Sequence, residues 1–384
     1  MSNLKSFYSK LVFLLLFVLI TLYLFQNYFK YDEKSQTIYS KLNTIENDEI
    51  DLILKGINEH TFNKYAILSV SILPDKDFYY FQLPAVVKSW SRIGYRTIII
   101  LVSNQIPVND QLALKTIEYL NKFGAILIYL KSLKDYEVTL SMVSRLYISL
   151  LDSNQINDHD FLLTSDSDLY PINKDYYLSD SLLETNKDFV FLWNAYCCGS
   201  FKYINKSYVM YPMAHIGARK YQWREIMGLN EQNKFDFGFI LNDVENFLSK
   251  QNQTVKRNDK IERGDEMWYL DQHMISVRLS NYDKLYKMNY DGLRFDRGFY
   301  DGKNDTLKNF LDLMPSYGLF NAIRIMLTNY DIVKFTDFHS FQDKVYKNIP
   351  VLESMFESLF DSETILILKK YHKEFMDIKS KNKM

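Results

Sequence analysis

Short runs of apolar residues recur along the first half of the chain, and each of the first three precedes a longer stretch with helical periodicity. The apolar runs occupy residues 65–73, 96–103, 125–130 and 161–164. Helical spacing is expected over residues 78–90, 111–123 and 140–151, and Gly124 is the expected stop of the second helix. Strands that alternate with helices across short links predict an α/β fold, with a mostly parallel sheet flanked by helices.

The fourth apolar run is followed by two carboxylates one residue apart. They belong to Asp166 and Asp168, and Pro171, which lacks a backbone donor, ends any strand soon after. Residues i and i+2 of an extended chain point to the same side, so these carboxylates are expected to converge. Beyond the carboxyl end of a strand, they suit a divalent cation such as Mg²⁺ or Mn²⁺, whose open positions a diphosphate can fill. The competing interpretation is an acidic turn.

Composition narrows the class of protein. The chain has 384 residues, of which 47% are hydrophobic and 24% charged, as in ordinary globular proteins, and its net charge of −1 gives no electrostatic reason to bind nucleic acid. No Gly-x-Gly-x-x-Gly follows the first apolar run and no P-loop motif is present, so neither a dinucleotide cofactor nor a P-loop ATPase is indicated. The two cysteines, Cys197 and Cys198, are adjacent, so we expect two buried free thiols and no disulfide.

The N-terminus carries an apolar run at residues 11–25 that only Thr21 interrupts, and Lys5 and Lys10 precede it. As a helix, residues 11–29 would be about 28 Å long at about 1.5 Å per residue, enough for a thin bilayer. We therefore expect an uncleaved transmembrane signal anchor. A cleaved signal peptide is the main rival, but no small-residue pair follows the run. The lysines place the short end in the cytosol and the rest of the chain in the lumen.

This topology divides the chain into five parts. They are a cytosolic tail (1–10), the transmembrane anchor (11–29), a polar stem (30–63), a lumenal domain (64–378) and a basic tail (379–384). Three glycosylation sequons begin at Asn205, Asn252 and Asn304. They agree with a lumenal domain without establishing it.

Acidic residues also gather at a helix expected over residues 264–279. Asp265 and Glu266 lie in its first turn, where carboxylates most often act as caps or complement the helix dipole. Asp271 lies three residues after Trp268, so the two side chains share a face of the helix.

Together these features resemble type II Golgi glycosyltransferases with the GT-A fold, of the nucleotide-diphospho-sugar transferase superfamily. The tail, anchor and stem carry the likeness, together with the α/β domain and the Asp-x-Asp at residues 166–168. Further likenesses are Trp-Tyr-Leu-Asp-Gln at 268–272, a late Asp-Phe-His at 337–339, and the stretch 210–217 followed by 223–225. The resemblance supports a class of enzyme and leaves donor and acceptor open.

The resemblance implies that a sugar nucleotide is bound through Mn²⁺ or Mg²⁺. By position in the motif, Asp168 contacts the metal, and Asp166 reaches the metal, the ribose or both. His339 is the candidate third ligand, with a capping or core histidine as the alternative, and its neutral imidazole suits Mn²⁺ better than Mg²⁺. Arg145 is expected to hold a phosphate of the nucleotide or to orient the aspartates, with a structural ion pair as the alternative.

The acceptor hydroxyl must lose a proton, so an inverting enzyme needs a carboxylate base. Asp271 is the first candidate, followed by Glu266 and Asp265. In a retaining enzyme Asp271 would instead bind sugar hydroxyls. The aromatic residues that are candidates for stacking on sugar or base, each with a place in the core as the alternative, are Trp193, Trp268 and Tyr269.

The sequence therefore predicts a metal-dependent glycosyltransferase of the Golgi membrane. It would transfer a sugar from a nucleotide-sugar donor to a glycan, protein or lipid acceptor in the secretory pathway. The alternative is a non-catalytic lumenal protein of the same fold that binds sugar nucleotides or glycans. A membrane-anchored nucleotidyltransferase would need a Gly-rich basic loop after the first strand, and residues 72–77 are neither Gly-rich nor strongly basic.

Overall fold

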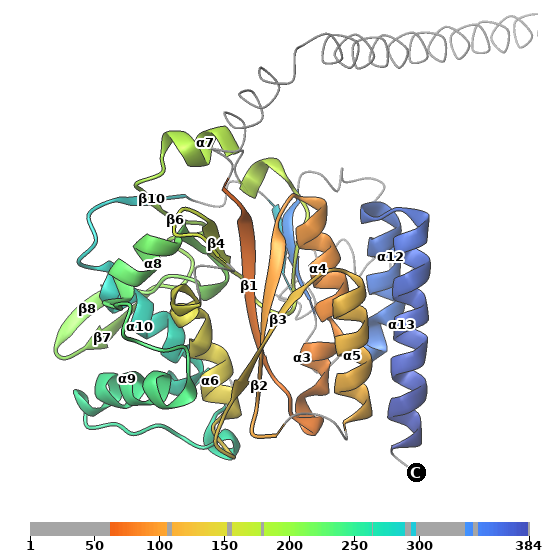
Figure 1. Ribbon diagram of the computed structural model, residues 1–384, viewed down its shortest axis with the longest axis horizontal. Helices are drawn as coiled ribbons and strands as arrows, with labels where there is room; N and C mark the ends of the chain where they lie inside the picture. Colours follow the sequence, from red (N-terminus) through yellow and green to blue (C-terminus); the bar gives the residue numbers. More distant parts are fainter. Residues whose placement is uncertain are drawn as a thin grey trace, which may run out of the picture. The chain divides into compact units, whose positions relative to one another are not determined.

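A seven-stranded sheet lies at the centre of the computed structural model (Figure 1), in the order β10-β6-β9-β4-β1-β2-β3. Its strands are β1 (Lys64–Ser71), β2 (Arg96–Ser103), β3 (Ile126–Lys131), β4 (Phe161–Thr164), β6 (Val190–Leu192), β9 (Ile216–Arg219) and β10 (Leu285–Lys287). Neighbouring strands pair in parallel except where β9 pairs with β4 and β6. The prediction of an α/β fold with a mostly parallel sheet is confirmed.

The structure describes most of the chain beyond residue 61. The described ranges are 62–105, 110–151, 156–177, 180–262, 264–288, 293–296, 335–340 and 345–382. The predicted cytosolic tail, the anchor at 11–29 and the stem up to residue 61 lie outside them. Among the helices in these ranges, none combines the length and the apolar character needed to cross a membrane.

The strand order reverses at β1, because β2 follows β1 on one side of the sheet and β4 lies on the other. In open sheets of this kind ligands bind beyond the carboxyl ends of the strands at such a reversal. Here those ends are Ser71 on β1 and Thr164 on β4. The fold therefore directs attention to the edge where the two aspartates follow β4.

Both faces of the sheet are buried, which is why its strands consist largely of apolar residues. Side chains alternate along β1: Ala66, Leu68 and Val70 enter one hydrophobic core, while Tyr65 and Ile67 enter the other. Each fully buried aliphatic side chain of this kind contributes roughly 1.5–3 kcal/mol. Two cores on opposite faces hold β1 rigidly, and with it the site at its end.

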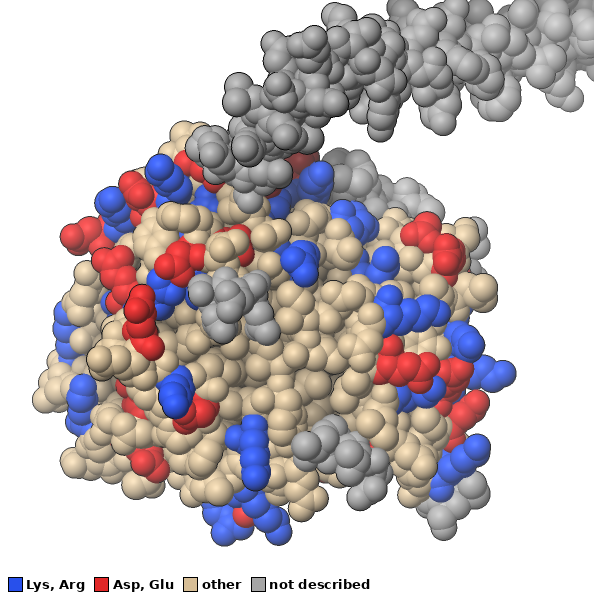
Figure 2. All heavy atoms as spheres, in the orientation of Figure 1, with Lys and Arg blue, Asp and Glu red and all other residues tan. Residues whose placement is uncertain are grey.

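Helices cover the two faces as two groups (Figure 1). One group consists of α3 (Asp77–Phe81), α4 (Leu83–Arg92), α5 (Gln111–Lys122), α12 (Ile349–Leu359) and α13 (Ser362–Lys381). The other consists of α6 (Glu137–Val143), α8 (Lys220–Met227), α9 (Phe237–Ser249) and α10 (Leu270–Leu279). On the face drawn in Figure 2, basic and acidic side chains are interspersed.

The predicted end of the helix at Gly124 is confirmed, and the helix predicted over residues 140–151 is not. Asp110 caps α5 by accepting from the backbone N–H groups of the second and third helical residues, and Gly124 takes a φ of 75° just beyond its end. The single helix expected over 140–151 is wrong. α6 ends at Val143, and a 3-10 helix, η2 (Ser144–Leu150), follows it and carries Arg145. Six consecutive residues of η2 are buried, so its winding is set by tertiary packing and not by one apolar face.

Two smaller sheets complete the strand pairing. β5 (Leu169–Pro171) pairs in antiparallel fashion with β12 (Phe335–His339), which pairs in parallel with β11 (Leu293–Asp296). β7 (Ser200–Tyr203) and β8 (Lys206–Val209) form a separate hairpin. The sequon residues Asn205, at the turn of this hairpin, and Asn252 are both exposed, and Asn304 lies outside the described residues.

The expectation about the two cysteines is wrong. Cys197 and Cys198 form a disulfide in an exposed to half-buried turn between β6 and β7, and are not the buried free thiols expected. α13 continues to Lys381, so it includes the first three residues of the basic tail predicted over residues 379–384. Lys379 remains part of that helix and pairs with the buried Asp77 of α3.

Candidate functional site

A cavity of about 230 Å³ opens at the carboxyl ends of β1 and β4. Ser69 and Ser71 line it from the end of β1, and Asp166 and Asp168 line it from the turn after β4. Arg145 lines it from η2, the helix before that turn. The position agrees with the general rule for sheets whose strand order reverses.

The turn after β4 brings the two predicted aspartates to the same cavity. The backbone N–H of Leu169 donates to the carbonyl of Asp166 at 3.3 Å, so the chain curls between β4 and β5. Ser165 lies at the base of the turn, where its hydroxyl accepts from the indole N–H of Trp90 at 3.1 Å. The side chain of Asp166 is 30% exposed and that of Asp168 only 3%, so Asp166 faces the solvent side of the cavity.

His339 reaches the same turn from a distant part of the sequence. It ends β12 and stands opposite Leu169 of β5, and the next backbone N–H, that of Ser340, donates to the carbonyl of Asp168 at 2.8 Å. The His339 Nε2 atom then lies 3.1 Å from Asp168 Oδ1 and 3.6 Å from Asp166 Oδ2. Pairing between strands, rather than local sequence, fixes this approach.

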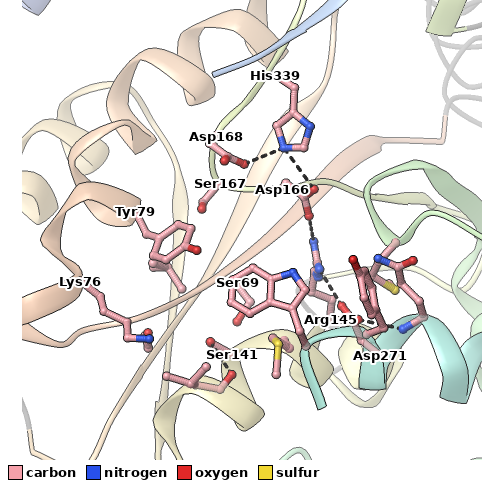
Figure 3. Close-up of a pocket in the computed structure, with 18 residues that line it drawn as sticks. Ser69, Lys76, Tyr79, Ser141, Arg145, Asp166, Ser167, Asp168, Asp271 and His339 are labelled. Atoms are coloured by element: carbon pink, nitrogen blue, oxygen red, sulfur yellow. Dashed lines mark hydrogen bonds and ion pairs between the residues drawn. The ribbon is translucent and has the colours of Figure 1, made fainter. Parts of the chain in front are cut away.

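These three residues form a cluster with the chemistry of a metal site. One possible ligand atom from each of Asp166, Asp168 and His339 lies within 4.8 Å of the others. Two carboxylate oxygens suit hard cations, and an imidazole nitrogen suits Mn²⁺ better than Mg²⁺. Because Nε2 is the ring atom that faces both carboxylates, the imidazole is already oriented to ligate the same ion (Figure 3). The donor set therefore fits a divalent cation.

Arg145 connects Asp166, a member of this three-residue cluster, to Asp271 (Figure 3). Its Nη1 donates to Asp166 Oδ1 at 2.8 Å and to the carbonyl of Ser165 at 2.6 Å, and its Nη2 donates to Asp271 Oδ2 at 2.8 Å. Burial disfavours the charge of the guanidinium, but the two carboxylates outweigh burial and raise the pKa of Arg145 above its ordinary value. Both ends of the guanidinium are thus bound to protein carboxylates, an arrangement that orients Asp166.

Asp271 lies in the first turn of α10 and lines the cavity. Its Oδ1 accepts from the backbone N–H of Gln272 at 2.8 Å. Burial raises the pKa of the Asp271 carboxyl above its ordinary value, while Arg145 acts in the opposite direction. The charged form of Asp271 is therefore stabilised by Arg145 and by the backbone N–H of Gln272.

The other acidic candidates lie away from the lining of the cavity. Asp265 caps the 3-10 helix η6 (Glu266–Tyr269) by accepting from the backbone N–H of Trp268 at 2.8 Å. Glu266 is exposed, and its Oε2 accepts from the side chain of Gln253 at 2.5 Å. Neither residue is among those that line the cavity.

The aromatic candidates separate into two kinds. Trp268 and Tyr269 line the cavity. Trp193 is fully buried in the core, and its indole N–H donates to the carbonyl of Tyr176 at 3.0 Å. His215, to which the sequence assigned no role, is also fully buried, and its Nε2 lies 3.1 Å from Asp337 Oδ2 on β12.

Lys76 is a lining residue that the sequence did not indicate as functional. It ends the 3-10 helix η1 (Pro74–Lys76), immediately after β1. The position of this lysine beyond a strand end was the available signal. The segment around it lacks the glycines of a phosphate-binding loop, so no motif marks this lysine.

Comparisons with known proteins are limited to fold. No protein-family model matches the sequence, and no curated protein matches it either. Solved structures give weak similarity. One is the galactosyltransferase LgtC in complex with donor and acceptor sugar analogs, with TM-score 0.34, 11% identity, and coverage of 64% of this chain and 81% of that chain.

Two further structures are similar at the same level. One is a glycosyltransferase involved in glycosylation of the major capsid of PBCV-1, with TM-score 0.31, 10% identity, and coverage of 72% of this chain and 92% of that chain. The other is S. aureus TarS 1–349 in complex with UDP, with TM-score 0.28, 14% identity, and coverage of 82% of this chain and 88% of that chain. Because these TM-scores are below 0.5, we argue function from the cavity itself.

Proposed function

We propose that the protein is a metal-dependent glycosyltransferase of the GT-A type. It would transfer a hexosyl or pentosyl group from a nucleotide-sugar donor to a glycan, protein or lipid acceptor. The observation that carries the proposal is the gathering of Asp166, Asp168 and His339 within 4.8 Å, beside a cavity at the reversal point of the sheet. A cation in this cavity would offset the charge of the donor's diphosphate, and the three residues supply ligands for that cation.

In this proposal Asp166, Asp168 and His339 hold Mn²⁺ or Mg²⁺. The ion, when bound, neutralises the charge that develops on the departing nucleoside diphosphate. Arg145 keeps the carboxylate of Asp166 in place by the 2.8 Å ion pair between them. Because Arg145 binds Asp271 as well, one side chain sets the geometry of both carboxylates.

Asp271 is the favoured acid–base residue among the candidates. It lines the cavity, and burial raises the pKa of its carboxyl, which makes the carboxylate a stronger base than an exposed one. It would accept the proton of the acceptor hydroxyl in an inverting reaction, or hold sugar hydroxyls in a retaining one. Glu266 is the weaker candidate, because it is exposed and outside the lining of the cavity.

The setting of the enzyme is proposed from the sequence. The apolar run at 11–29, preceded by lysines, supports a single-pass type II protein of the Golgi membrane with its catalytic domain in the lumen. The exposed sequons at Asn205 and Asn252 support the same side of the membrane.

The test is hydrolysis of, or transfer from, a panel of sugar nucleotides by purified full-length protein, with MnCl₂, MgCl₂ or EDTA. We expect turnover only with a divalent cation. Asp168→Asn should abolish it while leaving the circular dichroism spectrum unchanged. Asp175→Asn is the matched control, because Asp175 is exposed and lies outside the cavity. Turnover that resists EDTA, or that Asp168→Asn retains, would overturn the metal assignment.

Calorimetric titration with the same panel of sugar nucleotides, added to the turnover assay, tests the alternative of a non-catalytic binding protein. Cation-dependent binding of a sugar nucleotide by calorimetry, without turnover of any member of the panel on any acceptor, would favour that alternative.

A further inference from the structure

Lys76 provides a positive charge to the cavity from the side of β1. It follows the end of that strand on η1, and it lines the same cavity as Asp166 and Arg145. Figure 3 shows Lys76 and Tyr79 on one side of the cavity, with Arg145 and Asp271 on the other. Lys76 is only partly exposed, a degree of burial at which a lysine can pack its aliphatic stem and keep its ammonium in water.

The carboxylates nearest to Lys76 in sequence do not neutralise it. Asp77 is buried and engaged elsewhere: Tyr346 donates to its Oδ1 at 2.7 Å, and Lys379 pairs with its Oδ2. Asp75 is exposed and forms no ion pair with Lys76. Over the ranges that the structure describes, Lys76 forms no salt bridge with any carboxylate.

Arg145, the other arginine or lysine among the described residues that line the cavity, is already paired with carboxylates. Its two terminal nitrogens bind Asp166 and Asp271 at 2.8 Å each. Among the described residues that line the cavity, a ligand anion therefore meets one ammonium group that is not paired with a carboxylate, that of Lys76. An uncompensated lysine in a cavity that also holds a cation site is suited to a ligand with more than one anionic oxygen.

We propose that Lys76 is a donor-binding residue that contacts the anionic oxygens of the nucleoside diphosphate. This inference rests on the proposed glycosyltransferase function and deepens it. The diphosphate would contact the ammonium of Lys76 as well as the cation that Asp166, Asp168 and His339 would hold. Lys76 thereby selects nucleoside diphosphates over nucleosides, which lack these oxygens.

The experiment is calorimetric titration of full-length protein in MnCl₂ with ADP, CDP, GDP and UDP, and with the corresponding nucleosides. We expect Lys76→Gln to weaken binding of the preferred nucleoside diphosphate about 10- to 100-fold, the range for loss of one hydrogen bond to a charged group. Binding of the nucleoside and of Mn²⁺ alone should not change. Lys76→Arg, which keeps the charge, should restore most of the affinity for the diphosphate.

Lys131→Gln is the matched control, because Lys131 is also a lysine at the carboxyl end of a strand but is exposed and outside the cavity. Equal diphosphate affinity in wild type and Lys76→Gln would overturn the assignment of Lys76 and leave the proposed function standing. Equal weakening of nucleoside and diphosphate would also overturn it. If wild type binds none of the four diphosphates with Mn²⁺, the proposed function fails first, and the role of Lys76 fails with it.

Discussion

Replacing Arg145 with methionine tests how the buried charges of the site are held. Arg145 is the shared partner of Asp166 and Asp271, and the side chains of Arg145 and Asp271 are 9% and 4% exposed. Removing one partner of a buried ion pair costs about 3–5 kcal/mol, because the other charge stays buried without compensation. The side chain of Asp166 is 30% exposed, so water screens much of its charge once Arg145 is removed. We therefore expect Arg145→Met to lower the free energy of unfolding by about 3–5 kcal/mol at pH 7, mostly through Asp271.

The loss should depend on pH in a defined direction. Burial already raises the pKa of the Asp271 carboxyl, and removing Arg145 takes away the group that opposes this shift. When the pKa of a carboxyl is higher in the folded protein than in the unfolded one, its contribution to stability is fully present below the unfolded-state pKa. That contribution is lost as the pH rises through the folded-state pKa. The deficit of Arg145→Met is thus expected to be smaller at pH 5 than at pH 8.

The assay is urea unfolding of full-length protein followed by far-ultraviolet circular dichroism, without added metal, with the slope compared between variants. Arg224→Met is the matched control. Arg224 pairs with Asp158 at side-chain exposures of 22% and 44%, so its loss should cost about 1 kcal/mol or less. Adding Asp271→Asn to Arg145→Met should recover much of the deficit, because no buried charge is then stranded. The reasoning fails if Arg145→Met costs no more than Arg224→Met, or if the second substitution recovers nothing.

Two further predictions concern packing and protonation. Gly217→Ala should destabilise the protein by about 1–3 kcal/mol in thermal unfolding, because a Cβ there would meet the ring of Phe161 at 2.4 Å, between tightly packed strands. An unchanged melting temperature would contradict this. Burial lowers the pKa of His273 in the folded protein. The stability that the neutral imidazole contributes is therefore fully present above the unfolded-state pKa, and it is lost as the pH falls through the folded-state pKa. His273→Phe keeps the stacking on Phe201 and should flatten the fall in melting temperature between pH 7 and 5.5, whereas a parallel fall in both proteins would refute the assignment.

Local patterns in the sequence predicted the elements that local physics decides. The apolar runs became β1, β2, β3 and β4, since both faces of the sheet are buried and leave little room for polar residues. The α5 helix has the predicted stop, because Gly124 takes the left-handed conformation there. The Asp-x-Asp pair was visible because both its carboxylates come from one short turn.

Long-range contacts decided what the sequence did not predict. Arg145 was a candidate, but its bridge to Asp271 joins residues 126 positions apart and could not be read from spacing. The antiparallel β9 gives no sign of its direction in its four residues. Lys76 looks like an ordinary surface lysine until the cavity around it is known. Each case depends on which distant segments meet, and periodicity carries no information about that.

The pairing of β5 with β12 means that the cluster of Asp166, Asp168 and His339 joins two distant parts of the chain. Asp168 and His339 are 171 positions apart, so an ion bound by both would close the intervening chain into a ring. The entropy of closing such a ring grows only with the logarithm of its length, so residues inserted between the two ends would weaken the closure little. The ion would act as a reversible cross-link whose strength follows its free concentration. During synthesis, this cross-link could form only after β12 had been translated.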